Sequence, residues 1–168
     1  MRWMWIDRII ELVPREKIVT VKTVSMSEEH LHDHFAARGD RPAMPIMPAS
    51  LIIEGMAQSG GVLVGHASGF REKVVLAKVS KAELDVDVQP GQTLRYTTLI
   101  RQIDTAGAAT AGTVEVLDPA RPGEARKIGE VDLMFSHIDN NMAGTEFPAE
   151  NFVFSDAFRT LLRMSGVQ

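Results

Sequence analysis

The chain has 168 residues, a formal net charge of -4 and no cysteine. Hydrophobic residues make up 45% of it and charged residues 24%, which is an ordinary globular composition and argues against intrinsic disorder. Its basic residues are scattered and its pI is near 5.7, so the charge pattern gives no case for nucleic-acid binding. The lack of cysteine excludes disulfides and thiolate catalysis.

The N-terminal residues and the even spread of Pro and Gly indicate how the chain is organised. The apolar run at the N-terminus is interrupted by Asp7 and Arg8 and has no small-residue cleavage site, so we expect no signal peptide. No stretch approaches the roughly 18 apolar residues of a membrane-spanning helix. Neither a linker nor an internal repeat divides the sequence. We therefore expect residues 1–168 to form a single cytoplasmic domain.

A strand and a long helix are the first elements that the pattern predicts. Residues 17–24 are rich in β-branched side chains, which favour a strand. Pro48 then opens the run PASLIIEGMAQSGGVLVGH, whose apolar residues occupy almost every face, the pattern of a buried helix. Because proline has no N–H to leave unpaired, it suits the first helical position. We expect this helix to begin at Pro48 and to end between His66 and Gly69.

The second half of the chain changes to a period of two, which indicates β-strands. Apolar residues alternate with Asp85 and Asp87 in ELDVDV, and a QPGQ turn follows. Three more β-rich runs are separated by DTAG and DPARPGEA and predict a meander of antiparallel neighbours. The four predicted strands cover residues 83–88, 93–103, 109–117 and 127–138.

The C-terminal run SDAFRTLLRMSG predicts a short helix. Phe158, Leu161 and Leu162 have helical spacing, Ser155 is a candidate N-cap and Gly166 closes the segment. We expect this helix to dock on the sheet. The predicted fold class is α+β, an antiparallel sheet wrapped around a long central helix, plus this short C-terminal helix.

Three histidines alternate in the stretch HLHDH. If the stretch is extended, His30, His32 and His34 point to one side, and such a ladder could bind zinc with Asp33 or Glu54 orienting it. The alternative is that these imidazoles make ordinary hydrogen bonds or are solvated. Since the chain has no cysteine and no HExxH helix, we expect no metal site.

One carboxylate, Glu54, interrupts the long apolar helix. Carboxylates are rarely buried unless they are paired, so its presence needs a reason. It could lie on an exposed stripe, or complement the positive helix N-terminus, although that effect fades within the first turn. A functional interpretation is that a carboxyl in apolar surroundings acts as a general acid near neutral pH. Gln58, four residues on, shares its face and could hydrogen-bond it.

The start of the same helix offers backbone donors. The amides of Ala49 and Ser50 lie at the positive end of the helix and suit a carbonyl oxygen on which negative charge builds. With a histidine as base and Glu54 as acid, they suit proton abstraction beside a carbonyl with departure of a group from the next carbon. His66 is a poor base because 12 helical residues put it roughly 18 Å from Glu54. His137, on the last strand, is not excluded.

The residues just described resemble a known family. The pair HF and the stretch PIMPASLIIEGMAQ resemble the HFPGxPxMPGxLxIEAMAQ signature of the FabZ-type 3-hydroxyacyl-[acyl-carrier-protein] dehydratases, and MWIDRIIEL is similar to the opening segment of that family. The resemblance implies a hot-dog fold and a dimer whose two sheets join, commonly with three dimers in a hexamer. It also implies dehydration of a (3R)-3-hydroxyacyl thioester on acyl carrier protein to the trans-2-enoyl thioester, in fatty acid or lipid biosynthesis and without a cofactor.

The resemblance assigns a role to each residue that matches the signature. His34 is implied to take the C2 proton, and Glu54, with Gln58 nearby, to donate a proton to the departing 3-hydroxyl group. The Ala49 amide, beside Ser50, would hold the thioester carbonyl where the family uses a glycine amide. In the family the histidine and the carboxylate come from opposite protomers, so the active site would exist only in the dimer.

Three departures from the signature keep other functions open. His34 and Glu54 are 20 residues apart rather than 14, the Pro-Gly after HF is missing, and Ala49 and Ser50 replace a glycine and an apolar residue. One alternative is an acyl thioesterase of the same fold, which would use a carboxylate and water without this histidine. Another is a non-catalytic acyl-binding protein whose inserted loop has disabled the base. The basic residues that could dock an acidic carrier protein are Arg38, Arg41, Lys78 and Lys81.

Overall fold

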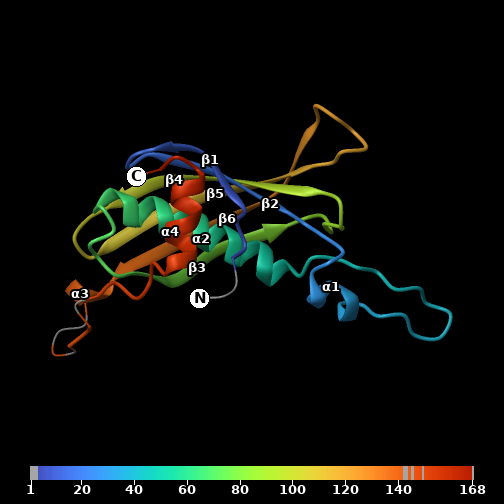
Figure 1. Ribbon diagram of the computed structural model, residues 1–168, viewed down its shortest axis with the longest axis horizontal. Coiled ribbons are helices and arrows are strands. Elements are labelled where there is room, and N and C mark those ends of the chain that lie inside the picture. The colour runs from blue at the N-terminus through green and yellow to red at the C-terminus, as the bar shows by residue number, and fades with distance from the viewer. Residues whose placement is uncertain (1–3, 142–143, 145, 149, 168) are drawn as a thin grey trace.

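A long helix lies inside the curl of one antiparallel sheet in the computed structural model, which describes residues 4–141, 144, 146–148 and 150–167 (Figure 1). The strands follow the order β1-β2-β4-β5-β6-β3, so that β1 and β3 form the two edges. The strands are β1 (Arg8–Val13), β2 (Lys17–Thr23), β3 (Val74–Leu84), β4 (Thr93–Ile103), β5 (Gly107–Leu117) and β6 (Ala125–His137). The helices are α1 (Glu29–Asp33), α2 (Ala49–Ala67), α3 (Ile138–Asn141) and α4 (Asp156–Met164).

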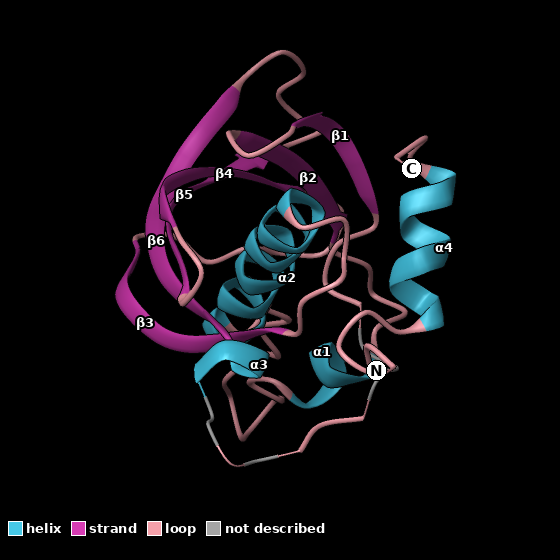
Figure 2. Cartoon of the chain, turned by 90° about the vertical axis from the view of Figure 1, so that its left-hand side faces the viewer, coloured by secondary structure: helices cyan, strands magenta, loops and turns pink. Residues whose placement is uncertain are grey.

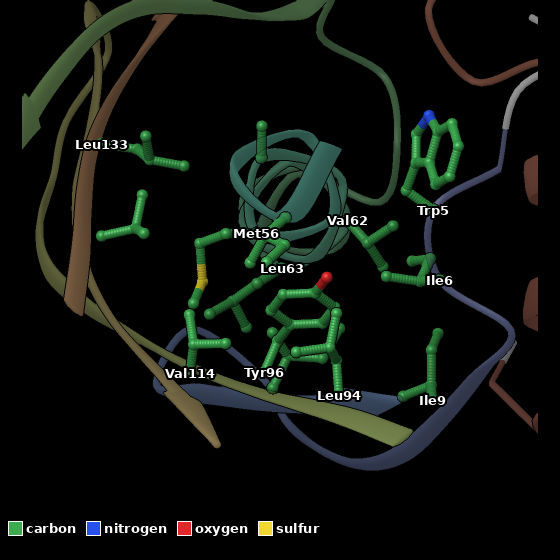
Figure 3. Close-up of a cluster of buried hydrophobic side chains, with 14 of the residues drawn as sticks. Trp5, Ile6, Ile9, Met56, Val62, Leu63, Leu94, Tyr96, Val114 and Leu133 are labelled. Atoms are coloured by element: carbon green, nitrogen blue, oxygen red, sulfur yellow. The ribbon is translucent and has the colours of Figure 1, made fainter. Parts of the chain in front are cut away.

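The core lies between α2 and the concave face of the sheet. Met56 and Leu63 of α2 are completely buried against Tyr96 of β4 and Val114 of β5, and Val62, also completely buried, points toward Ile6 (Figure 3). Each such side chain contributes about 1.5–3 kcal/mol through its burial. The expected buried helix is therefore confirmed, with its end at Ala67, inside the predicted limits. Pro48 is not its first residue but its N-cap, with φ -57° and ψ 133°, because its backbone is still extended.

Buried and half-buried residues alternate along the central strands, as the sequence indicated. Along β5 every second residue is buried, from Ala108 through Val116, and β4 alternates in the same way from Leu94 to Thr98. Successive side chains of a strand point to opposite faces, so one face of the sheet packs on α2. The strands predicted over residues 93–103, 109–117 and 127–138 are confirmed to within two residues at each end.

The strand predicted over residues 83–88 is largely wrong. β3 occupies Val74–Leu84 and ends where the alternation of Leu, Val and Asp begins. The alternating residues instead lie next to the loop that leads into α2, where Met47 N–H donates to Val88 O at 2.8 Å. β3 itself escaped prediction because an edge strand with mostly exposed side chains has no clear apolar period. β1 and α1 also lay outside the prediction.

Helix α4 is confirmed close to its predicted place. Figure 2 shows it standing beside the edge strand β1, at the open side of the curled sheet. The hydroxyl of Ser165 accepts a hydrogen bond from Ile9 N–H of β1 at 3.0 Å, which ties the helix to the sheet edge. Ser155 stands at the N-cap position but makes no capping hydrogen bond with its side chain. Gly166, after the helix, has the positive φ of 71° typical of a helix end.

Within the residues that the structure describes, no helix is both long enough and apolar enough to cross a membrane.

Candidate active site

The stretch HLHD is helical, so the extended ladder of histidines considered as one possibility does not form. Residues two apart on a helix do not face the same way, and α1 ends at Asp33, just before His34. The ring of His30 lies edge-on to Trp5 with 5.2 Å between centroids, and Nε2 of His32 is 2.9 Å from the carbonyl of Met26. Among the described residues, no three His, Asp or Glu side chains gather closely enough to hold a metal ion.

His34 is fixed by the segment that precedes α2. Its Nδ1 is hydrogen-bonded to the backbone carbonyl of Ile46. A carbonyl oxygen can only accept, so Nδ1 carries the proton, and Nε2 of the neutral ring keeps a lone pair. This is the tautomer that a general base requires.

The residues inserted after HF form a small hairpin that closes on itself. Arg38 and Arg41 exchange two backbone hydrogen bonds, of 3.0 and 3.1 Å, and Met44 N–H donates to Phe35 O at 2.9 Å. Phe35 adopts a φ of 59°, an unusual value for a side chain of this size, and so makes the turn for which the family signature has Pro-Gly. The guanidinium of Arg41 lies 5.7 Å from the centroid of the Phe35 ring. In Figure 1 this loop between α1 and α2 projects beyond the sheet.

His34 and Ala49 line the same cavity. It has a volume of about 370 Å³ and is bounded by Phe35, by Ile46 and by residues 84–87, at the end of β3 and just after it. Ala49 is the first residue of α2, so its N–H is one of the amides that the helix itself leaves without a partner. Ser50 is exposed and does not line this cavity.

Glu54 and Gln58 form a hydrogen-bonded pair on α2, as their spacing predicted. Gln58 Nε2 donates to Glu54 Oε1 at 2.9 Å, while Gln58 Oε1 accepts from the backbone N–H of Trp5 at 2.8 Å. The Trp5 N–H requires an acceptor, so the amide of Gln58 has only one orientation that serves both bonds. Gln58 is buried and Glu54 half-buried. The pair therefore holds one carboxyl in a fixed direction.

A second cavity, of about 530 Å³, opens beside this pair. Apart from Glu54 and Gln58 its walls are apolar. Glu54 and Gln58 thus lie at one cavity, and His34 and Ala49 at another, so one chain does not bring the four predicted residues together.

The remaining histidines face neither cavity. The ring of His66, near the end of α2, packs edge-on against Phe70 at 5.8 Å. His137, at the end of β6, is buried with its Nδ1 2.7 Å from the Glu72 carboxylate. The sequence could not reveal two contributors to the site, the Ile46 carbonyl and the Trp5 amide, because backbone groups are the same in every residue.

Comparison with known proteins places this chain in a family. A family model described as the FabA-like domain matches residues 2–117, well over half of the chain. The chain belongs to this family. It is 33% identical over 140 residues to the 3-hydroxyacyl-[acyl-carrier-protein] dehydratase FabZ of Clostridium kluyveri, covering 83% of this chain and 88% of that protein. The enzyme of the same name from Enterococcus faecalis is 32% identical over 133 residues, covering 78% of this chain and 83% of the relative.

Solved structures match the fold at low sequence identity. A dehydratase heterocomplex, ApeI:P from Xenorhabdus doucetiae, has a TM-score of 0.57 at 17% identity, covering 83% of this chain and 87% of that chain. A thioesterase family protein from Silicibacter pomeroyi has a TM-score of 0.59 at 12% identity, covering 77% and 82%. Likeness at such identity concerns the fold alone, and the expected hot-dog fold is confirmed.

Proposed function

We propose that this chain is a dehydratase that converts a (3R)-3-hydroxyacyl thioester on acyl carrier protein into the trans-2-enoyl thioester, in the cytoplasm and as a step of fatty acid or lipid biosynthesis. The observation that carries the proposal is that the chain orients both groups the reaction needs: Ile46 O binds His34 Nδ1, which leaves the lone pair of Nε2 for a base, and Gln58 holds the carboxyl of Glu54. Its membership of the FabA-like family and the names of its FabZ relatives support the same reaction.

A dimer would complete the site. Strand β3 pairs with β6 on one side and with no other described strand, so its second edge is free for another chain. Leu76 and Val79 on this strand are each 41% exposed, which leaves apolar surface for a partner. Two-fold pairing along β3 would join two sheets and place His34 of each chain at the Glu54 of the other. Three such dimers would make the hexamer implied by the family resemblance.

The reaction needs two proton transfers and one oxyanion contact. His34 Nε2 takes a proton from C2, and the electrons move toward the thioester carbonyl, whose oxygen accepts a hydrogen bond from Ala49 N–H. Glu54, held by Gln58, donates its proton to the 3-hydroxyl group, which leaves as water while the C2–C3 double bond forms. The histidine ends protonated and the glutamate ionised, and proton exchange with solvent restores both. No cofactor is required, since the thioester itself acidifies the C2 proton.

The test is turnover of (3R)-3-hydroxyacyl thioesters, followed both by the ultraviolet absorbance of the enoyl product and by a reagent that detects free thiol. Dehydration gives enoyl absorbance and no thiol. Release of thiol without enoyl product would identify a thioesterase instead. Neither signal from a folded, dimeric protein would contradict catalysis and favour an acyl-binding role.

Among the four basic residues considered for carrier docking, the hairpin arginines fit best. Lys81 is engaged with Glu83 and Glu130 at 3.2 and 2.6 Å, and these hydrogen bonds, the one to Glu130 first, raise the pKa of Lys81. Lys78 lies on β3, at the proposed dimer edge. Arg38 is exposed on the projecting hairpin that begins beside His34. An acidic carrier protein docked there would deliver its acyl group to the cavity of the base.

Charge reversal by Arg38→Glu is expected to raise KM for the carrier-bound substrate about tenfold, because one attractive contact becomes repulsive. Turnover of a small thioester that lacks the carrier should stay within about twofold, since charges at the rim act on docking rather than on chemistry. Arg159→Glu, an exposed charge reversal on α4, serves as the matched control. Equal effects on both substrates would show damage to the site rather than loss of docking.

A further inference from the structure

The cavity beside Glu54 has one polar end and an apolar body. The carboxyl of Glu54 and the amide of Gln58 form the polar end, and the other lining side chains are hydrocarbon, from Ala57 on α2 to Phe135 on β6. Such a cavity suits a ligand whose reactive group meets the carboxyl while an alkyl chain extends along the helix.

Small residues on α2 make the room in this cavity. Ala57 and Gly61, one turn apart on the cavity side of the helix, present almost no side chain. A Cβ at Gly61 would lie 3.7 Å from Phe135 Cε1, an ordinary contact, so a larger side chain has space to enter the cavity there. At the neighbouring Gly60 a Cβ would come within 2.9 Å of the Phe135 ring. Gly61 is therefore the position at which the cavity can be filled without moving the sheet.

Residues 152–154 and Phe158 form another wall of the cavity, and they lie beyond the part of the chain matched by the family model. Asn151 Nδ2 donates to the carbonyls of Phe70 and Glu72 at 2.9 and 3.0 Å, and Asn151 Oδ1 accepts from Val153 N–H at 3.1 Å. These bonds tie the start of this wall to residues 70–72, just after α2. The wall therefore holds a defined position relative to the helix.

Two phenylalanines of the wall differ in how firmly they are held. Phe154 is buried, its ring lies 4.9 Å from that of Phe70, and it fills the space left by Gly65, where a Cβ would come within 2.3 Å of it. Phe152 lines the same cavity but is 53% exposed. Phe154 thus anchors the wall, and Phe152 forms its outer rim.

We propose that the space between Gly61 and Phe152 takes the acyl chain and limits the enzyme to chains of medium length, an inference that rests on the proposed dehydratase function. Glu54 and Gly61 are seven residues apart on α2, a rise of about 10 Å. An extended alkyl chain advances a little over ~1 Å per carbon, given the length and angle of a carbon–carbon bond. The cavity beside α2 therefore takes about eight carbons between Glu54 and Gly61, and Phe152 at its exposed rim limits longer chains.

The test compares kcat/KM for 3-hydroxyacyl thioesters from four to sixteen carbons in wild type, Gly61→Leu and Phe152→Ala. Gly61→Leu should lower kcat/KM for the longest substrate that wild type accepts by about 10- to 200-fold and change the four-carbon value by less than about twofold. Phe152→Ala should raise the relative kcat/KM for the next longer chains by about tenfold. Met164→Ala, which also truncates an exposed apolar side chain near the C-terminus, should leave the profile unchanged.

An unchanged chain-length profile in both variants would overturn the inference while leaving the dehydratase function intact. If wild type turns over no substrate, the proposed function fails on its own. In that case calorimetric binding of saturated pantetheine thioesters to the same proteins decides the inference. Weaker binding of a long chain by Gly61→Leu, with short-chain binding retained, would support it, and equal binding by both proteins would overturn it.

Discussion

Replacement of His34 by alanine should lower the rate of dehydration by about 10²- to 10⁴-fold, and Glu54→Gln should do the same, because each removes a group that transfers a proton. Gln is matched in size to Glu and keeps a partner for Gln58, so the loss reports the missing proton rather than a missing hydrogen bond. The measurement is steady-state formation of enoyl thioester by each purified variant. Unfolding temperatures close to that of wild type would exclude a loss of fold as the cause.

Mixed dimers test whether the two residues act across the interface. A dimer of one His34→Ala chain and one Glu54→Gln chain would contain one intact site, made of the unaltered His34 of one chain and the unaltered Glu54 of the other. Such heterodimers should recover about half the wild-type activity, since a two-fold dimer has two equivalent sites. The experiment uses two affinity tags, one on each variant, to isolate the heterodimer.

A second heterodimer, which carries both substitutions on one chain, should be inactive. A heterodimer of wild type and a chain that carries both substitutions would have no intact site if the residues act across the interface, yet it would keep one if they act within a chain. Activity of this heterodimer, together with none from the first, would contradict the shared site. The separate cavities of His34 and Glu54 make the first outcome the expected one.

The sequence predicted those parts of the site that depend on local spacing. Glu54 and Gln58 are four residues apart on a helix whose apolar pattern was unmistakable, and their hydrogen bond followed from that geometry alone. The central strands were equally clear, because β5 buries every second residue. In both places the spacing of the apolar residues matches the period of the helix or strand, and burying those residues requires the same structure.

The parts that escaped depend on contacts between distant segments. The local pattern of HLHDH is compatible with a strand as well as with a helix. Packing favours the helix α1, because it buries Leu31 in the core. The turn at Phe35 had no signal, since a phenylalanine with positive φ is held there by the hairpin around it rather than by its own preference. Likewise, no local pattern indicates that the segment around Phe154 returns to cover α2.

A substitution of Gly55 by alanine should destabilise the protein by about 1–3 kcal/mol, the usual cost of an overpacked core. The family signature has alanine directly after its glutamate, so this change would restore the common residue. Here, however, a Cβ would lie 2.5 Å from Tyr96 Oη and 2.9 Å from Trp5 O. To relieve these contacts α2 must shift away from β4, which also displaces Glu54. Denaturant unfolding and kcat are the measurements, and both should decrease.

Gly61→Ala is the matched control on the same helix. Its Cβ has ordinary contact distance to Phe135, and alanine is the better helix former, so its stability should equal or exceed that of wild type by up to about 1 kcal/mol. A loss at Gly55 without a loss at Gly61 would attribute the effect to the contact with Tyr96 rather than to glycine as such.

Tyr96 provides the second half of this test. The side chain is fully buried, burial raises its pKa above the ordinary range, and its hydroxyl has no hydrogen-bond partner among the described residues. Tyr96→Phe should therefore stabilise the protein by about 1 kcal/mol, because a buried, unpaired hydroxyl is removed. In the double variant part of the Gly55→Ala cost should disappear, with a coupling of about 0.5–3 kcal/mol. Strict additivity would mean that the phenol does not occupy the space that an alanine at position 55 requires.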